Sequence, residues 1–265
     1  MDTLQSIILA FIEGLTEFLP VSSTGHLILT SSVMGIERDE FTKLYEIAIQ
    51  LGAILSVVVV YWKKFFDFSR GKFYIKLMVS VIPALVLGFL LSDKIDRLME
   101  SPTTVASSLL LGGIILLFID RLFTKPTVLE EKDISYQKGF VIGFWQCLAM
   151  VPGVSRSAAS IIGGMQQKLS RKVAAEFSFF LAVPTMAAAT GYKMLKTFQL
   201  HPEILKNKHN LITLGIGNII AFIVAMIAIK FFIGYLQKHG FKLFGWYRIA
   251  LGIIVLALLQ LGIIK

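Results

Sequence analysis

Long apolar runs separated by short charged loops dominate the pattern of this chain. Six runs of roughly 17–25 residues have the length that a helix needs to cross the hydrocarbon core of a bilayer. We expect these spans at about 44–62, 75–92, 103–119, 173–192, 211–233 and 244–263. The pattern therefore predicts an all-α polytopic membrane protein with six transmembrane helices.

Two more apolar stretches are interrupted midway by proline and polar residues. The first covers residues 3–34 and is broken around Pro20, and the second covers about 138–166 and is broken at Pro152 and Gly153. The halves of the first stretch are too short to span a membrane alone. Irregular backbone at membrane depth must be buried in protein or line a water-filled cavity. We therefore expect both stretches to be re-entrant helix-loop-helix segments.

The order of these elements repeats, because one interrupted segment and three spans occur twice. A re-entrant segment returns to its own side of the membrane whereas three spans do not, so we expect an inverted-topology repeat. The whole chain, 1–265, is expected to form one integral membrane domain with repeat halves of about 1–120 and 135–265. Interrupted segments that enter from opposite sides would meet near the midplane, where such folds place their substrate.

Composition and charge agree with a membrane protein. The chain is 55% hydrophobic and 16% charged, and its apolar runs leave too little polar surface for a soluble protein. The net charge of +9 does not indicate a nucleic-acid partner, because the basic residues lie in short loops between the apolar runs. Their excess in the loops at 62–76 and 120–138 predicts that these loops are cytoplasmic and that both termini lie outside. The single cysteine, Cys147, excludes an internal disulfide.

The first break lies in EGLTEFLPVSSTGH, which places ionisable groups inside an apolar surround. Such groups are functional candidates in a membrane protein. Glu13 and Glu17 are four residues apart and share a helix face. Two ionised carboxylates that are close in a low dielectric need a cation, such as a hard divalent metal ion, or one of them must be protonated. The alternative is that both carboxylates face an aqueous vestibule and only solvate it.

The same stretch continues with Ser22, Ser23 and His26. If a helix restarts after the break, Ser23 and His26 face one cavity, and a hydroxyl beside a base is the minimal arrangement for an activated nucleophile. The alternative has equal weight on this stretch alone, because serine caps helices routinely and a lone histidine is often structural.

The second break lies in PGVSRSAAS, which places Arg156 deep in an apolar run. Ser155 can cap the helix that follows, and the free N–H groups of that helix N-terminus favour an anion. An arginine fork, hydroxyl groups and backbone donors together make a phosphate-binding set. The hydroxyls of this set come from Ser155, Ser157 and Ser160. Alternatively, Arg156 holds the two halves together by pairing with Glu13, Glu17 or Glu176.

Together the two stretches supply carboxylates, a nucleophile and an anion clamp at membrane depth. A substrate with a phosphate head and a lipid tail satisfies these demands, with the tail leaving between helices into the lipid. The residues therefore indicate hydrolysis of a phosphorylated membrane lipid. The alternative is a transporter or flippase for such a lipid, because inverted repeats with broken helices are also a transporter design. A carrier would need Arg156 but would have little use for Ser23 and His26 beside two carboxylates.

The two stretches resemble the two signature motifs of the undecaprenyl-diphosphate phosphatase family, also called bacitracin-resistance proteins. The resemblance runs along the whole chain in length, span order and motif placement. It implies that the protein removes the terminal phosphate from undecaprenyl diphosphate with Mg²⁺ or Ca²⁺ as cofactor, and so recycles the lipid carrier of peptidoglycan synthesis. It also implies a bacterial inner-membrane location with a site that opens toward the outer, periplasmic face, in agreement with the loop charges.

Positions carry over from the family one by one. Glu13 and Glu17 match its acidic pair. Ser23 and His26 match its hydroxyl and histidine, and Arg156 matches its arginine. On this basis Ser23 is assigned as the nucleophile, Glu17 and His26 handle protons, and Glu13 with Glu17 holds the metal ion. A phosphohistidine at His26 and direct attack by a metal-bound water are the alternatives. The positions assigned to substrate binding are Ser22, Ser155, Arg156, Ser157 and Ser160.

The chain departs from the family pattern at one place. The second motif usually continues with glycine after its second serine and ends in threonine, whereas Ala158 and Ser160 stand at these places here. Ser160 keeps a hydroxyl, so we expect the reaction to be unchanged. The sequence leaves open the lipid chain length, the physiological metal and the oligomeric state, a homo-oligomer included.

Overall fold

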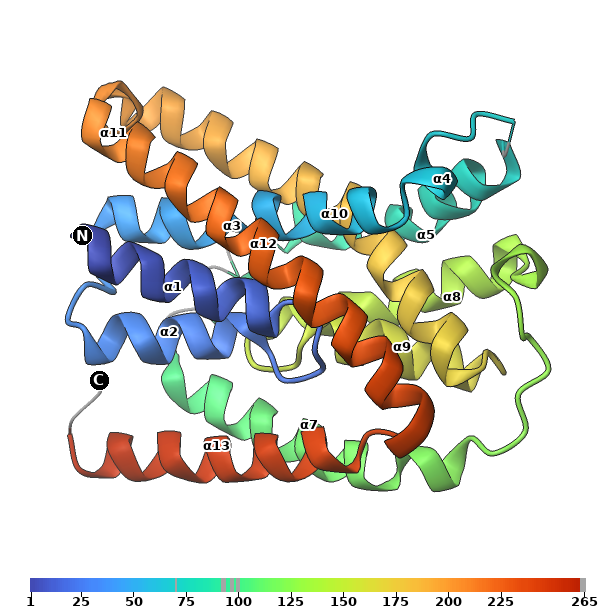
Figure 1. Cartoon of the computed structure of the whole chain (residues 1–265). Coiled ribbons are helices and arrows are strands. Elements are labelled where there is room, and N and C mark those ends of the chain that lie inside the picture. Colours follow the sequence, from blue (N-terminus) through green and yellow to red (C-terminus); the bar gives the residue numbers. More distant parts are fainter. Residues whose placement is uncertain (70, 92–93, 96–97, 99–100, 263–265) are drawn as a thin grey trace.

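The computed structural model describes all residues except 70, 92–93, 96–97, 99–100 and 263–265 (Figure 1). Within this part of the chain there is no strand, and one isolated bridge joins Val128 to Leu169. The helices are α1 (Thr3–Thr16), α2 (Ser23–Val33), α3 (Glu40–Val60), α4 (Trp62–Phe65), α5 (Gly71–Leu90), α7 (Pro102–Leu122), α8 (Tyr136–Gln146), α9 (Arg156–Gln166), α10 (Arg171–Leu200), α11 (Pro202–Lys206), α12 (Lys208–His239) and α13 (Lys242–Gln260). Short 3₁₀ turns, η1 and η2, cover Glu131–Asp133 and Cys147–Met150. The expected all-α class is confirmed.

Six of the described helices are long and apolar enough to cross a membrane, namely α3, α5, α7, α10, α12 and α13. Each coincides with one of the predicted spans. The helices α10 and α12 run further than predicted, to 30 and 32 residues. The prediction followed the apolar run alone, whereas lysine is a good helix former and α10 continues past Lys193 and Lys196 to Leu200. The predicted span ends at residues 92 and 263 lie outside the described residues.

Both interrupted segments form helical hairpins. The helices α1 and α2 pack together, as do α8 and α9 with η2 between them. Figure 1 shows that α1 begins and α2 ends at the end of the molecule where α13 also ends, whereas α8 begins and α9 ends at the opposite end. The two hairpins therefore enter the helical bundle from opposite ends. Their re-entry into a lipid bilayer, and the exact limits of the repeat halves, stay predictions.

Each hairpin packs on a long helix of the other half of the chain. The helix α1 lies against α12, and α8 lies against α5. Small residues permit this close approach: a Cβ atom at Gly14 would lie 2.6 Å from the Ala221 carbonyl oxygen, and one at Gly143 would overlap the Ser80 carbonyl. Close contacts of this kind are typical of helix packing in membranes. The two halves are thus interlocked rather than placed side by side.

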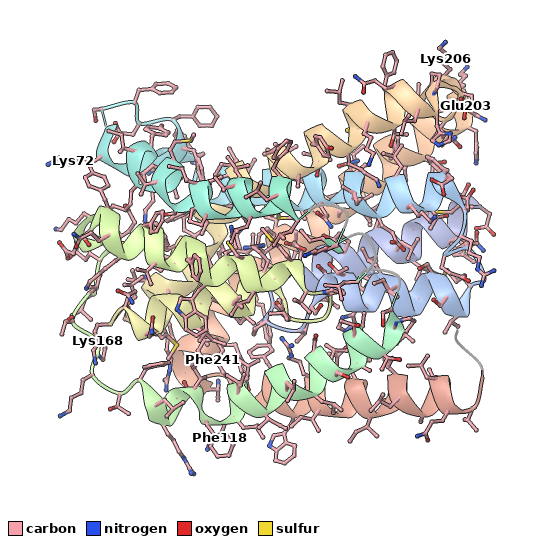
Figure 2. The ribbon with its side chains drawn as sticks, turned by 180° about the vertical axis from the view of Figure 1, so that it is seen from behind. Lys72, Phe118, Lys168, Glu203, Lys206 and Phe241 are labelled. Carbon is pink, nitrogen blue, oxygen red and sulfur yellow. The ribbon has the colours of Figure 1, made fainter. Side chains whose placement is uncertain are left out.

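The surface of the bundle has an apolar middle and charged ends. Figure 2 shows Lys72 and Lys168 at one end, Glu203 and Lys206 at the other, and Phe118 on the outer side of α7 between them. Phe118 is 51% exposed, and many other large apolar side chains of the spans are exposed in the same way. So much exposed apolar surface is unfavourable in water and suits contact with lipid.

Candidate active site

The two hairpin breaks have the same unusual backbone conformation. Ser22 caps α2 with φ 72°, and its Oγ accepts a hydrogen bond from the Gly25 N–H (3.3 Å). Ser155 caps α9 with φ 74°, and its Oγ accepts from the Ala158 N–H (3.2 Å). A positive φ is costly for a residue with a side chain, and such strain persists where the surrounding structure enforces it. The predicted cap at Ser155 is confirmed, and each capping hydroxyl still has its own hydrogen to donate.

Glu17 joins the two hairpins. Its Oε1 accepts from Nη2 of Arg156 at 2.7 Å, and its Oε2 accepts from Oγ of Ser23 at 2.6 Å. Glu17 and Ser23 are both buried. One carboxylate therefore contacts a hydroxyl of its own hairpin and the guanidinium of the other. The interpretation in which Arg156 pairs with a glutamate to hold the halves together is confirmed for Glu17.

The remaining contacts of Arg156 orient its guanidinium. Nη1 donates to the main-chain oxygen of Ser178 at 3.0 Å and to the Ser178 Oγ at 3.3 Å. The guanidinium carbon lies 5.7 Å from the centre of the Phe18 ring. Nε is buried and has no hydrogen-bond partner among the residues that the structure describes. Arg156 is thus fixed on two sides and keeps one donor for a ligand. Ser178 lies outside both polar stretches, and the sequence around it shows only a hydroxyl group in an apolar helix.

Glu13 is the least satisfied group of the site. It is fully buried, and neither of its carboxylate oxygens has a hydrogen-bond partner in the described part of the chain. The charges that act on it are those of Glu17, Glu46 and Arg156. A buried carboxylate without a partner is costly unless a cation or a proton joins it.

This arrangement can accommodate a magnesium ion. Within the described residues, no three His, Cys, Asp or Glu side chains form a cluster that could hold a metal by themselves. Mg²⁺ does not need one, because it is usually bound by one or two carboxylates together with waters and substrate phosphates. The unpartnered oxygens of Glu13, with Glu17 close by, fit that pattern.

Two of the predicted phosphate ligands already have partners inside the protein. Ser157 donates its hydroxyl to the Phe18 carbonyl (2.8 Å), which is a second link between the hairpins. Ser160 donates to the Arg156 carbonyl (2.8 Å) and lies 2.7 Å from the Ser178 Oγ. Both serines are completely buried. In this structure both hydroxyls are engaged in hydrogen bonds within the protein, and their role in substrate binding stays a prediction.

His26 lies beside the first break but does not bond to Ser23. Its Nδ1 is 2.7 Å from the Ser22 carbonyl oxygen, and its Nε2 is 2.6 Å from the Tyr247 hydroxyl. The hydroxyl of Ser23 is instead bonded to Glu17. Ser23 is therefore paired with Glu17, whereas His26 contacts Tyr247 of α13.

Arg248 is the major residue that sequence reasoning left without a role. It is completely buried, and within the described ranges its donors reach main-chain carbonyls alone, at 2.8–3.4 Å. These belong to Pro20 in the first break, Gly153 and Val154 in the second, and Ser108 and Leu109 in α7. The available signal was a single arginine inside the last apolar span, which is a functional or structural candidate by default.

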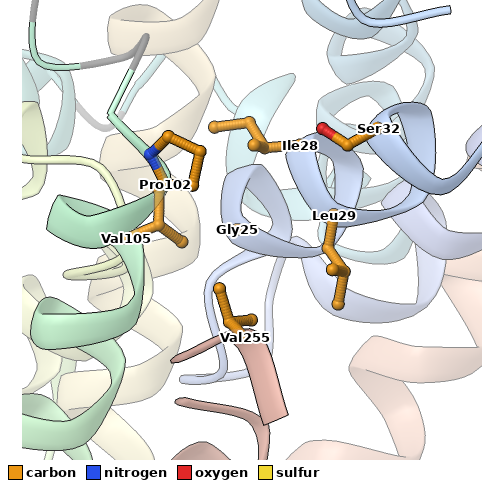
Figure 3. A pocket seen from close by; sticks show the side chains of 7 residues that line it. All are labelled: Gly25, Ile28, Leu29, Ser32, Pro102, Val105 and Val255. Atoms are coloured by element: carbon orange, nitrogen blue, oxygen red, sulfur yellow. The ribbon is translucent and has the colours of Figure 1, made fainter. Parts of the chain in front are cut away.

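A small apolar cavity adjoins the site (Figure 3). It begins at Gly25, within the first turn of α2, and follows α2 to Ser32. The other walls come from α7 and α13. The lining residues are Gly25, Ile28, Leu29, Ser32, Pro102, Val105 and Val255. Its chemistry suits a hydrocarbon chain rather than a polar group.

These features define a polytopic helical membrane protein with a buried carboxylate, hydroxyl and arginine where two helical hairpins meet. The sequence matches the family described as Bacitracin resistance protein BacA over residues 6–254, and the chain belongs to this family. It is 58% identical over 257 residues to the undecaprenyl-diphosphatase of Flavobacterium johnsoniae, covering 97% of this chain and 96% of the relative. The protein of the same name from Porphyromonas gingivalis is 50% identical with 99% of both chains covered, and that from Campylobacter jejuni is 45% identical with 100% and 97% covered.

The contacts of Arg248 generate a stability prediction. Arg248→Met leaves several buried carbonyls without donors, so the free energy of unfolding should fall by more than about 3 kcal/mol. Arg248→Lys keeps the charge and three donors and should lose less. Melting of the detergent-solubilised protein, followed by tryptophan fluorescence or circular dichroism, measures both. Arg121→Met, at an exposed arginine of α7, is the control and should melt like the wild type. Equal melting of Arg248→Met and wild type would show that the breaks do not need this side chain.

Proposed function

We propose that this protein is a membrane phosphatase that hydrolyses undecaprenyl diphosphate to undecaprenyl phosphate and inorganic phosphate. The observation that carries the proposal is the Ser23–Glu17–Arg156 contact between the two hairpins, in a family whose relatives bear the name undecaprenyl-diphosphatase. The reaction returns the lipid carrier to peptidoglycan and envelope synthesis. It also accounts for bacitracin resistance, the trait after which the family is named.

The protein lies in the bacterial inner membrane in this proposal. Both termini and the opening of the site face the periplasm, because basic residues are more frequent in the loops at the opposite end. The hairpin of α1 and α2 opens toward the same end as the N-terminus (Figure 1). A lipid diphosphate would then enter from the outer leaflet.

Arg156 and the N-terminus of α9 bind the diphosphate. The unpartnered Nε of Arg156 can donate to a phosphate without breaking an existing hydrogen bond. The hydroxyl hydrogens of the two capping residues, Ser22 and Ser155, are further donors at the helix N-termini. A phosphate that binds the guanidinium of Arg156 weakens the ion pair between Arg156 and Glu17. Glu17 then becomes a stronger base toward the hydroxyl of Ser23. Substrate binding and activation of the nucleophile are coupled in this way.

The chemical step begins at Ser23. Its oxygen attacks the terminal phosphorus while Glu17 takes the hydroxyl proton at Oε2, and the bond from that phosphorus to the bridging oxygen breaks. Undecaprenyl phosphate leaves, and the phosphoryl group stays on Ser23. Water then attacks the same phosphorus, the Ser23–phosphorus bond breaks, and Glu17 returns its proton to the serine oxygen as inorganic phosphate forms. Positioning and charge neutralisation supply most of the catalysis in such transfers.

Glu13 and Glu17 would hold the divalent cation, Mg²⁺ or Ca²⁺. When bound, such an ion neutralises charge on the diphosphate oxygens. The chain's own contribution is to keep Glu13 buried and unpaired beside Glu17, so that a cation is favoured there. His26 assists proton transfer around the site.

The apolar surface that α2, α7 and α13 present in Figure 3 contacts the first isoprene units of the tail, because the hollow between these helices is too small to enclose one. It starts at Gly25, close to Ser23, and reaches Ser32, seven residues on and thus about 10 Å further along α2. That length corresponds to more than one isoprene unit. The rest of the tail lies in the lipid between helices.

The function is tested by phosphate release from C55 and C15 isoprenyl diphosphates by the purified protein. Release should require Mg²⁺ or Ca²⁺ and stop with EDTA. Arg156→Ala should reduce kcat/KM by about 10²–10³-fold through lost charge stabilisation. Ser23→Ala should reduce kcat by at least about 10³-fold through loss of the nucleophile.

The variants also separate the alternatives. Release that survives in Ser23→Ala but not in Arg156→Ala moves the nucleophile to His26 or to water, and trapping a phosphorylated residue after a rapid quench decides between these. No release by a folded wild-type protein would refute the phosphatase and favour lipid transport.

Glu13→Gln tests the cation site. Removing the unpartnered charge should raise the Mg²⁺ concentration for half-maximal activity by about tenfold or more, because a neutral amide is a poor ligand for a hard cation. The melting-temperature rise on adding Mg²⁺ should shrink in parallel. Glu176→Gln is the matched control, since Glu176 pairs with Lys64 away from the hairpin contact, and it should respond to Mg²⁺ like the wild type. An unchanged Mg²⁺ response in Glu13→Gln would remove Glu13 from the site.

Ser32→Phe tests this contact of the tail. A bulky ring at the far end of the apolar surface should raise KM several-fold for C15 and C55 diphosphates but leave a C5 diphosphate unaffected, because one isoprene unit does not reach Ser32. Val33→Phe, at the neighbouring 64% exposed position, is the control and should behave like the wild type. If Ser32→Phe had the wild-type KM for C15 and C55 diphosphates, the tail would lie elsewhere.

A further inference from the structure

Tyr247 belongs to neither polar stretch, yet it contacts the site. It lies on α13, far along the chain from both hairpins, and its hydroxyl is 2.6 Å from Nε2 of His26. The two rings lie nearly parallel and edge to edge, with their centres 5.6 Å apart and their planes 4° from parallel. One aromatic residue therefore holds the histidine through a hydrogen bond that lies close to the plane of both rings.

The second contact of His26 determines which nitrogen carries the proton. Nδ1 lies 2.7 Å from the Ser22 carbonyl oxygen, and a carbonyl can only accept, so Nδ1 must donate. In the neutral ring Nε2 then has the lone pair, and it accepts the hydroxyl hydrogen of Tyr247. Ser22 and Tyr247 together select one tautomer and one ring orientation.

The position of Tyr247 is itself fixed by the next residue. Arg248 is bonded to carbonyls of both hairpin breaks, including Pro20 and Gly153. A shift of α13 would break these bonds, so this turn of the helix is tied to the breaks. Tyr247 is consequently held against His26 although its own side chain is 46% exposed.

We propose that Tyr247 is a positioning residue for the reaction, which together with the Ser22 carbonyl holds His26 in the tautomer with hydrogen on Nδ1 and fixes the direction of its Nε2. This inference rests on the proposed phosphatase function. The tyrosine does not touch the reacting atoms. Its role is to keep the histidine from pairing with Ser23 or Glu17 and to hold a single ring orientation from which the proton transfer starts.

The test is Tyr247→Phe, which removes the hydroxyl and keeps the ring. The kcat for C15 isoprenyl diphosphate should fall about 5- to 10-fold, as expected for the loss of one hydrogen bond, while KM changes less than about twofold. Melting should be unchanged. Tyr235→Phe is the matched control. Tyr235 lies near the end of α12 and also packs on a histidine, with 4.6 Å between the centres of its ring and that of His239, but it does not contact His26. It should keep the wild-type kcat.

A second measurement does not depend on activity. Nitrogen NMR of ¹⁵N-histidine-labelled protein reports the protonation of each ring nitrogen, and His26→Gln assigns the His26 signals among the four histidines. The unliganded wild type should show one His26 tautomer with hydrogen on Nδ1, and Tyr247→Phe should shift the Nε2 signal or add the second tautomer.

The outcomes are distinct. Wild-type kcat or unaltered His26 signals in Tyr247→Phe would overturn the inference. If the wild type itself releases no phosphate, the proposed function fails, and the nitrogen signals still decide whether Tyr247 sets the tautomer.

Discussion

Broken helices inside a membrane leave carbonyl groups without partners, and one buried side chain satisfies them at both breaks of this protein. Arg248 donates to Pro20 in the first break, to Gly153 and Val154 in the second, and to two carbonyls of α7. Unpaired carbonyls and an unpaired guanidinium would each be costly at this depth. The carbonyls and the guanidinium stabilise each other here. The meeting of the two hairpins and the burial of this charge therefore depend on the same set of hydrogen bonds.

The candidate site follows from that meeting. Only when the hairpin tips are side by side does Glu17 reach Arg156 at 2.7 Å and Ser157 reach the Phe18 carbonyl. The strained caps at Ser22 and Ser155 persist because these contacts enforce them from both sides. The carboxylate that holds the halves together in the free protein is also the group that contacts the Ser23 hydroxyl. In the proposed mechanism, a diphosphate that binds Arg156 would weaken this structural ion pair and leave Glu17 to act on Ser23.

Local pattern was sufficient to predict much of the molecule. Apolar run length gave the six spans, prolines beside serines gave the two hairpins, and the Ser155 cap follows from residue type alone. Contacts between distant segments could not be predicted from pattern. Arg248 and Tyr247 lie on the last span, and nothing local shows that their partners are in the two breaks. The direction of His26 was missed for the same reason, because the choice between Ser23 and Tyr247 as partner is made by the packing of α13.

The two hairpins also show how one backbone design can serve two chemical roles. Ser22 and Ser155 are equivalent caps, and counting from them aligns Ser23 with Arg156 and Glu13 with Gln146. The same break therefore carries carboxylates and a hydroxyl in one copy and a guanidinium in the other. Had both copies kept carboxylates, their charges would repel where the tips meet. Because the two tips meet in the fold, a carboxylate of the first lies against the guanidinium of the second, and opposite charges pair where the hairpins join.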